Sequence, residues 1–301
     1  NDPFVANALR SHKHFEPCWC GSGRKFKKCH SIRREQAPYT LGQISSEQEK
    51  VFWRPRGCMH PTASESTCQG GVIDAHTIQR KGPLERIIDS ANHVLHFKPS
   101  REAGGLELEK IGWKRASIFP GYCARHDASL FRGIESAPFT GANEQCVLLA
   151  FRNLCNEIYR KQALKESLEY LREVLDRGFS LDQQISAQYS LAASIAGQAK
   201  SIQEGNALRA KFEGAITSND FGQFSSKCYA FCGEISVVSS SMFQCEFDFI
   251  GNRLADQWNF STDMHMLSHS IMNTTNGGII VFVWQNDDYL AQQTVESFGK
   301  I

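Results

Sequence analysis

Four side chains that can bind a metal lie close together near the start of the sequence. Cys18 and Cys20 form a Cys-x-Cys pair, and Cys29 and His30 follow after a loop of eight residues that opens with Gly21–Gly23. Three thiolates and one imidazole can surround a zinc ion tetrahedrally, and glycines allow the sharp turn that such a loop needs. Because so short a segment cannot fold on apolar burial, zinc capture must supply its folding energy, and chelation should melt it.

The segment PCWCGSGRKFKKCH resembles the SEC-C motif, best known as the zinc-binding tail of the bacterial preprotein-translocating ATPase and also attached to many unrelated bacterial proteins. All four ligands and both spacings agree, and residues 25–28 reproduce the basic and aromatic filling of the loop. The resemblance implies a zinc module that docks a protein or nucleic-acid partner and carries no chemistry of its own. A chance cluster of free thiols is the alternative.

Basic residues are concentrated at the N-terminal end, although the net charge of the whole chain is only +1. The first 35 residues contain eight lysines and arginines against three acidic residues. Such a surface, with Trp19 and Phe26 interleaved, suits the phosphates of nucleic acid or an acidic protein. A zinc knuckle whose basic surface faces only solvent, without a partner, is an equally good interpretation. We assign partner binding to four residues of the loop: Arg24, Lys25, Lys27 and Lys28.

A second region rich in cysteine and histidine begins near residue 57. Cys58 and Cys68 would form one arm of a zinc site, and the Cys-x-x-His pair of Cys123 and His126 would form the other. The first arm is irregular, because nine residues separate its cysteines where zinc knuckles usually have about two to four. His60 is the candidate substitute ligand. The sequence therefore predicts two zinc ions per chain.

The layout of this second region resembles the treble-clef, ββα-metal architecture of the HNH nucleases. In that family a strand ending in a histidine follows the first arm, and the closing Cys-x-x-Cys/His pair opens a helix. His76, in Asp74-Ala75-His76, stands at the position of the strand histidine, and Asp127 follows the closing pair. The resemblance implies that His76 is a general base that activates water against a phosphodiester, with a catalytic divalent ion such as Mg²⁺ on the scissile phosphate.

The same region also departs from the HNH pattern. The middle asparagine of the family has no clear counterpart, and Asn92 and His93 are the candidates. Asp127 replaces the usual closing histidine, or that residue is lost. An insertion separates the two arms, with residues 83–88 expected to be helical and 93–97 to form a short apolar strand. The region is therefore interpreted either as a divergent nuclease or as an inactive zinc scaffold with His76 in its core.

The periodicity of apolar residues predicts the elements beyond the second zinc region. Spacings of three and four indicate amphipathic helices over residues 143–160, 165–175 and about 181–213, which would pack as an antiparallel bundle. Alternation from Thr217 onward indicates four strands of a mostly antiparallel sheet, over 227–238, 242–250, 264–271 and 278–284. A final helical pattern over 287–301 is still running where the sequence ends, which leaves a longer natural chain open.

These patterns together predict an α+β protein. We expect four regions: a zinc knuckle over 1–36, a treble-clef-like zinc domain over 50–139, a helical bundle over 140–215 and a mostly β region over 216–301. A polar linker over about 36–50 would separate the two zinc regions. The sequence does not indicate an oligomeric state.

Composition excludes several classes of protein. The chain of 301 residues is 41% hydrophobic and 22% charged, as in ordinary globular proteins. We expect a cytoplasmic protein without a membrane partner, because no apolar run approaches the roughly 18 residues that span a bilayer and no secretion signal is visible. Phosphate-binding loops, nucleophile elbows and dinucleotide fingerprints are absent, so we expect no nucleotide cofactor.

Eleven cysteines in a reducing compartment are not expected to form a disulfide framework. Those clustered with histidines are interpreted as metal ligands. The others are interpreted as small buried hydrophobic residues: Cys146, Cys155, Cys228, Cys232 and Cys245.

Two functional hypotheses follow. In the first, this is a zinc-binding bacterial protein that engages nucleic acid or another macromolecule, and could be a divergent nuclease of a defence or mobile-element system. In the second, it is a non-enzymatic, zinc-stabilised adaptor for a protein partner. The environment of His76 distinguishes the two hypotheses. A catalytic imidazole should reach solvent close to an Asp, Asn or His that can share a divalent ion.

Overall fold

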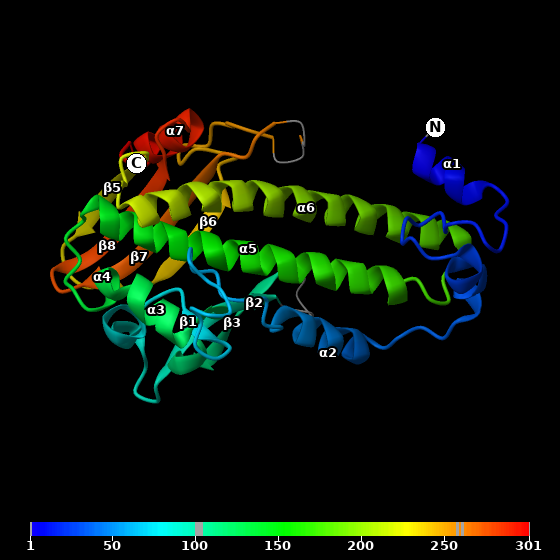
Figure 1. Cartoon of the computed structure of the whole chain (residues 1–301), viewed down its shortest axis with the longest axis horizontal. Coiled ribbons are helices and arrows are strands. Elements are labelled where there is room, and N and C mark those ends of the chain that lie inside the picture. The colour runs from blue at the N-terminus through cyan, green and yellow to red at the C-terminus, as the bar shows by residue number, and fades with distance from the viewer. Residues whose placement is uncertain (1, 100–104, 257–258, 260–261, 301) are drawn as a thin grey trace. The chain divides into compact units, whose positions relative to one another are not determined.

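The computed structural model describes residues 2–99, 105–256, 259 and 262–300, and its fold is α+β as predicted. The chain forms two compact units. Unit 1 comprises Asn1–Arg54 and Arg160–Gln203, and unit 2 comprises Pro55–Tyr159 and Glu204–Ile301. Two long helices, α5 (Asn143–Val174) and α6 (Leu181–Ser218), each contribute one part to either unit (Figure 1).

Helix α5 is longer than the sequence pattern predicted. The separate helices expected over 143–160 and 165–175 form one continuous helix, so the three-helix bundle is wrong and a two-helix arrangement replaces it. Residues 161–164 read Lys-Gln-Ala-Leu, which are all good helix formers and contain no breaker. The turn before α6 occurs at Gly178, whose φ of 77° is the left-handed conformation that favours glycine.

Several helices of unit 1 were not predicted from the sequence. Helix α2 (Leu41–Phe52) occupies most of the segment interpreted as a polar linker, so the linker over 36–50 is wrong. Thr40 and Gln43 form a capping box, in which the Thr40 hydroxyl accepts a hydrogen bond from the Gln43 amide at 3.3 Å. Ile44 and Val51 are buried. The other elements of the unit are short: α1 (Pro3–Leu9) and the 3₁₀ helices η1 (Phe26–Lys28) and η2 (His30–Glu35).

The first part of unit 2 contains two small antiparallel sheets. Strand β1 (Val72–His76) pairs with β4 (Ile118–Cys123), and β2 (His93–Pro99) pairs with β3 (Leu106–Gly112). The strand predicted over 93–97 is therefore confirmed. The helical turns predicted over 83–88 are present as η3 (Arg80–Leu84) and η4 (Glu85–Ile87). The remaining elements are η5 (Trp113–Arg115), α3 (Ala124–Leu130) and α4 (Arg132–Glu135).

The four-stranded antiparallel sheet predicted for the C-terminal part is confirmed. Its strands are β5 (Phe224–Phe231), β6 (Ser239–Gln244), β7 (Met266–Thr274) and β8 (Gly277–Gln285), in the order β5-β8-β7-β6. Helix α7 (Tyr289–Phe298) follows, and the Asp288 carboxylate caps it by accepting a hydrogen bond from the Ala291 amide at 3.0 Å.

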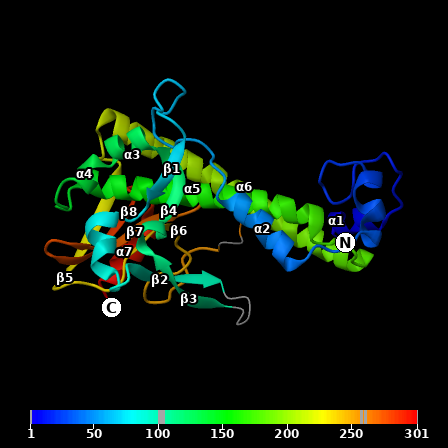
Figure 2. The ribbon, with the colours of Figure 1, turned by 90° about the horizontal axis from the view of Figure 1, so that it is seen from below.

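Alternating residues of β8 pack on opposite sides of this sheet. Ile279, Val281 and Val283 belong to a core cluster that includes Cys146 and Phe151 of α5. The intervening residues belong to a second cluster that includes Ala291 and Val295 of α7: Ile280, Phe282 and Trp284. Strand β8 is therefore packed on both faces of the four-stranded sheet, whose strands lie between α5 and α7 in Figure 2.

Candidate metal centres

The first candidate metal centre is built by the loop of residues 16–31. Its turn is closed by backbone hydrogen bonds, from the Cys18 amide to the Arg24 carbonyl at 2.7 Å and from the Gly21 amide to the Cys18 carbonyl at 3.2 Å. Gly21 and Gly23 have φ values of 75° and 72°, so both turns need glycine. The helices η1 and η2 then bring Cys29 and His30 back to the Cys-x-Cys pair.

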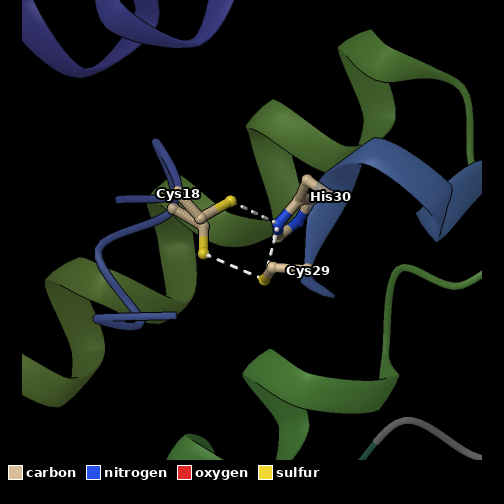
Figure 3. A group of neighbouring side chains, drawn as sticks. Cys18, Cys29 and His30 are labelled. Atoms are coloured by element: carbon tan, nitrogen blue, oxygen red, sulfur yellow. Dashed lines mark hydrogen bonds between the residues drawn. The ribbon is translucent and has the colours of Figure 1, made fainter. Parts of the chain in front are cut away.

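The ligand atoms of the four side chains lie within 4.8 Å of one another. Figure 3 shows Cys18, Cys29 and His30 pointing toward one another. The His30 Nδ1 atom lies 3.2 Å from both the Cys18 and Cys29 sulfurs, and the Cys20 and Cys29 sulfurs are 3.7 Å apart. Tetrahedral zinc with bonds of about 2.0–2.3 Å places its ligand atoms roughly 3.3–3.8 Å apart, within about 0.1 Å of the separations seen here. All four ligand residues are buried. The arrangement therefore fits a closed, structural zinc site.

The electrostatics of the thiols also suit a cation. Hydrogen bonds with Cys20 and Cys29 raise the pKa of Cys18. The hydrogen bond with Cys18 lowers the pKa of Cys29. Thiolate charge is therefore already favoured at part of the cluster, and thiolates are the form that binds zinc.

A buried carboxylate orients the histidine ligand. The Nε2 atom of His30 lies 2.8 Å from Asp176 Oδ2, while Nδ1 faces the sulfurs. Asp176 is completely buried and also accepts a hydrogen bond from the Gln188 amide group at 2.9 Å. This carboxylate fixes the imidazole with Nδ1 free for the metal. No local sequence pattern points to this contact, because Asp176 and His30 lie 146 residues apart in the chain.

The knuckle also packs on the helices of unit 1 through apolar and charged contacts. Trp19 is only 3% exposed, and its ring lies 4.3 Å from His30 and 5.8 Å from Phe4. Arg24 pairs with Glu173 of α5 at 2.5 Å. Arg172 of α5 donates a hydrogen bond to the Cys20 carbonyl. One side of the knuckle is therefore covered by the chain itself.

The second candidate metal centre is formed by Cys58, Cys68, Cys123 and His126. The His126 Nδ1 atom lies 3.4 Å from the Cys58 sulfur and 3.6 Å from the Cys68 sulfur. Cys123 ends β4 and His126 lies in the first turn of α3, so a strand and a helix present the closing pair. These distances also fit one tetrahedral zinc ion.

This second centre is more open than the first. Cys58 and Cys68 are half-buried and, with Cys123, line a cleft of about 330 Å³. His60, the candidate substitute ligand, instead stacks on His126 with ring centroids 4.1 Å apart. Burial and the neighbouring His126 lower the pKa of His60 to about 4. The neutral His60 ring therefore lies against the imidazole of His126, one of the four candidate metal ligands.

The candidate catalytic residues occupy different environments. His76 ends β1, is half-buried, and its Nε2 atom is buried without a hydrogen-bond partner. Burial, followed by the charge of Arg80, lowers its pKa. Burial raises the pKa of Asp127 in α3. Asn92 lies in the turn before β2 with a φ of 61°, and His93 begins that strand with Nδ1 3.6 Å from an Asp89 oxygen.

The described residues contain two clusters of three or more His, Cys, Asp or Glu side chains that could hold a metal ion. These clusters are the two Cys₃His groups. His76, His93 and Asp127 take part in neither. In the same residues, no helix combines the length and the apolar character needed to cross a membrane.

Comparison with known proteins supports the first centre. The family model described as the SEC-C motif matches residues 16–31, which contain Cys18, Cys20, Cys29 and His30. Comparisons with curated proteins and with solved structures gave no match. The zinc-binding character of the first cluster therefore rests on both its motif and its geometry, and two Cys₃His groups are arranged to hold two zinc ions.

Proposed function

We propose that this protein is a zinc-stabilised binding protein that engages single-stranded nucleic acid through its N-terminal knuckle. The observation that carries the proposal is the division of the knuckle into two sides. Arg24 and Arg33 face the helices of unit 1, where Arg33 lies 3.4 Å from Asp176. Lys25 and Lys28 remain exposed. The basic residues not used for docking are thus available to a partner.

An exposed aromatic ring lies among these lysines. Phe15 is 67% exposed, and the Nζ atoms of Lys27 and Lys25 lie 4.1 and 5.7 Å from its ring centroid. Surfaces that bind single strands combine cations for the phosphates with aromatic rings on which bases stack. We call Phe15, Lys25, Lys27 and Lys28 the knuckle surface. Its composition favours nucleic acid over an acidic protein, because an acidic protein has no need of the exposed ring.

Fluorescence anisotropy with a labelled single-stranded RNA or DNA oligonucleotide, measured over a range of salt concentrations, tests this proposal. The triple variant Lys25→Ala, Lys27→Ala, Lys28→Ala should flatten the plot of log affinity against log salt by about 0.7 per lost phosphate contact. The variant Phe15→Ala should weaken binding by about 1–3 kcal/mol through lost stacking.

The matched control removes the same charge elsewhere. Lys81, Lys114 and Lys211 are exposed residues of unit 2, and replacing all three with alanine should leave the salt slope unchanged. Equal losses in the two triple variants would mean that total charge, and not the knuckle surface, determines binding. Binding of an acidic protein but of no oligonucleotide would favour the adaptor hypothesis.

A divergent HNH-like nuclease is the second candidate function. The order β1, β4 and α3 around Cys123 and His126 supports it, because His76 then lies on the first strand of a ββα arrangement. The buried Nε2 atom of His76 weighs against it. Nicking of plasmid DNA or RNA with Mg²⁺ tests the idea. His76→Ala should abolish cleavage while the zinc content stays at two per chain. His96→Ala serves as the control, because His96 lies on β2 and is not a candidate catalytic residue.

A further inference from the structure

Two cysteine sulfurs outside the metal centres lie close together in unit 2. Cys146 in the first turn of α5 and Cys228 on β5 have their Sγ atoms 3.9 Å apart. Cys146 is completely buried, whereas Cys228 is exposed. The prediction of a buried hydrophobic role is confirmed for Cys146, Cys155 and Cys245, and it is wrong for Cys228 and Cys232, which are exposed.

A second contact between the same elements keeps the two sulfurs opposite each other. The Ser226 hydroxyl donates a hydrogen bond to Asn143 Oδ1 at 3.0 Å, and the Asn143 amide group donates to the Phe224 carbonyl at 3.1 Å. Residues 226 and 228 lie on one face of β5, and residues 143 and 146 lie one turn apart on α5. The strand and the helix are therefore aligned so that Cys228 faces Cys146.

The two thiols differ in the way that a redox pair requires. The hydrogen bond from Cys146 lowers the pKa of Cys228 to about 7, although burial opposes this shift. The same hydrogen bond raises the pKa of Cys146. The thiolate of Cys228, an exposed residue, is thus the nucleophile, and the buried Cys146 stays a thiol beside it. Oxidation-sensitive cysteines are typically exposed, rich in thiolate and adjacent to a second cysteine that resolves the first product.

We propose that Cys146 and Cys228 are a redox modification site, at which a peroxide or a low-molecular-weight disulfide converts the two thiols into a reversible disulfide between α5 and β5. The site is independent of the metal centres and of the proposed nucleic-acid binding. The sulfurs must approach from 3.9 Å to about 2.05 Å, which needs side-chain rotation and a small shift of the edge strand β5.

The reaction balances with either oxidant. With a disulfide such as oxidised glutathione, the Cys228 thiolate attacks one sulfur, forms a mixed disulfide and expels a glutathione thiolate. Cys146 then loses its proton and attacks the Cys228 sulfur, which expels the second glutathione. With hydrogen peroxide, the O–O bond breaks to give a Cys228 sulfenic acid and hydroxide, and attack by Cys146 then releases water. In both cases the two protein thiols lose two electrons to the oxidant.

Peptide mapping of the full, zinc-loaded chain tests the proposal. The protein is equilibrated with mixtures of reduced and oxidised glutathione, quenched with acid, and alkylated after denaturation. We expect a peptide pair joined through residues 146 and 228, lost again on addition of a reductant, while zinc stays at two per chain. The variant Cys146→Ser should lose this cross-link and accumulate glutathione on Cys228. Cys228→Ser should leave Cys146 as a thiol.

Cys232→Ser is the matched control, since Cys232 is an exposed cysteine only four residues along the chain. It should form the 146–228 cross-link to the same extent as the unmodified protein. Oxidation of Cys228 in the unmodified protein without loss of the Cys146 thiol would overturn the proposal, as would cross-linking of Cys228 to Cys232. Because both results come from the unmodified chain, they hold even where Cys146→Ser fails to fold.

Discussion

At the scale of the residue, Asp176 orients one ligand of the first candidate metal centre and is not itself one of the four ligands. Its carboxylate holds His30 Nε2 at 2.8 Å. Groups in this position typically change metal affinity about 10- to 100-fold when mutated. Asp176→Asn keeps the shape and an acceptor oxygen but loses the charge, so we expect a loss of zinc affinity of about tenfold at this centre. Competition with a chromogenic chelator measures it.

Glu173→Gln is the matched control for this prediction. Glu173 pairs with Arg24, but both side chains are close to half exposed, and exposed ion pairs contribute little, typically below about 1 kcal/mol. The affinity for zinc should stay within about twofold of the unmodified protein. An equal effect of the two substitutions would mean that docking of the knuckle as a whole, and not orientation of His30, sets the affinity.

The Cys228 thiol is the second residue with a measurable chemical signature. Because the thiolate is the reactive form, its rate of alkylation should rise with pH, reach half its maximum near pH 7, and level off above that value. Removing the hydrogen bond with Cys146→Ala should move this midpoint upward toward that of an ordinary thiol, about 8.5. Timed alkylation with mass spectrometry measures both. A midpoint unchanged by Cys146→Ala would show that Cys146 does not stabilise the thiolate.

At the scale of the element, two glycines of α6 test how closely this helix approaches α5 in unit 2. A Cβ atom at Gly205 would lie 3.0 Å from the Ile158 side chain, whereas one at Gly214 would meet nothing within 4 Å. Alanine is favoured over glycine inside a helix by about 1 kcal/mol. Gly214→Ala should therefore stabilise the protein by about 0.5–1 kcal/mol.

Gly205→Ala has the same helix propensity but crowds a buried contact. Ile158 is only 2% exposed and has little room to move, so overpacking should cost about 1–3 kcal/mol and cancel or reverse the gain. Chemical denaturation followed by circular dichroism compares the two variants. Equal stabilisation by both substitutions would mean that the helices can separate without cost.

The elements predicted correctly from the sequence are those with a strong local period. The apolar run of residues 278–284 identified β8, and it is apolar throughout because one face of that strand packs on α5 and the other on α7. Helix α2 was missed because most of its residues are polar, so its capping box at Thr40 and Gln43 was the only clear signal. The break expected between residues 160 and 165 was wrong because a gap in the apolar pattern was interpreted as the end of a helix.

The metal ligands were accessible to sequence analysis for a different reason. Zinc restricts both the type and the local spacing of its ligands, as in the Cys18 and Cys20 pair. Contacts that depend on tertiary structure carry no such pattern. Asp176 joins His30 across 146 residues, and Cys228 meets Cys146 across 82 residues. Neither pair could be found before the helices and strands were placed.

At the scale of the whole molecule, each compact unit contains one candidate zinc centre. The first centre lies in unit 1 and the second lies in unit 2. A structural zinc ion contributes roughly 10–16 kcal/mol, which is comparable with the entire stability of a domain of about 5–15 kcal/mol. Loss of one zinc ion is therefore expected to unfold most of the unit that contains it.

Selective loss of each metal ion is the last prediction. The double variant Cys18→Ser, Cys20→Ser should retain one zinc ion and lose hydrogen-exchange protection within unit 1. The matched variant Cys58→Ser, Cys68→Ser should also retain one zinc ion but lose protection within unit 2. In the unmodified protein a chelator should remove the second zinc first, because Cys58 and Cys68 are half-buried beside an open cleft while the ligands of the first centre are buried. Loss of protection in both units of either variant would instead mean that the chain unfolds as one cooperative body, with stability shared along α5 and α6.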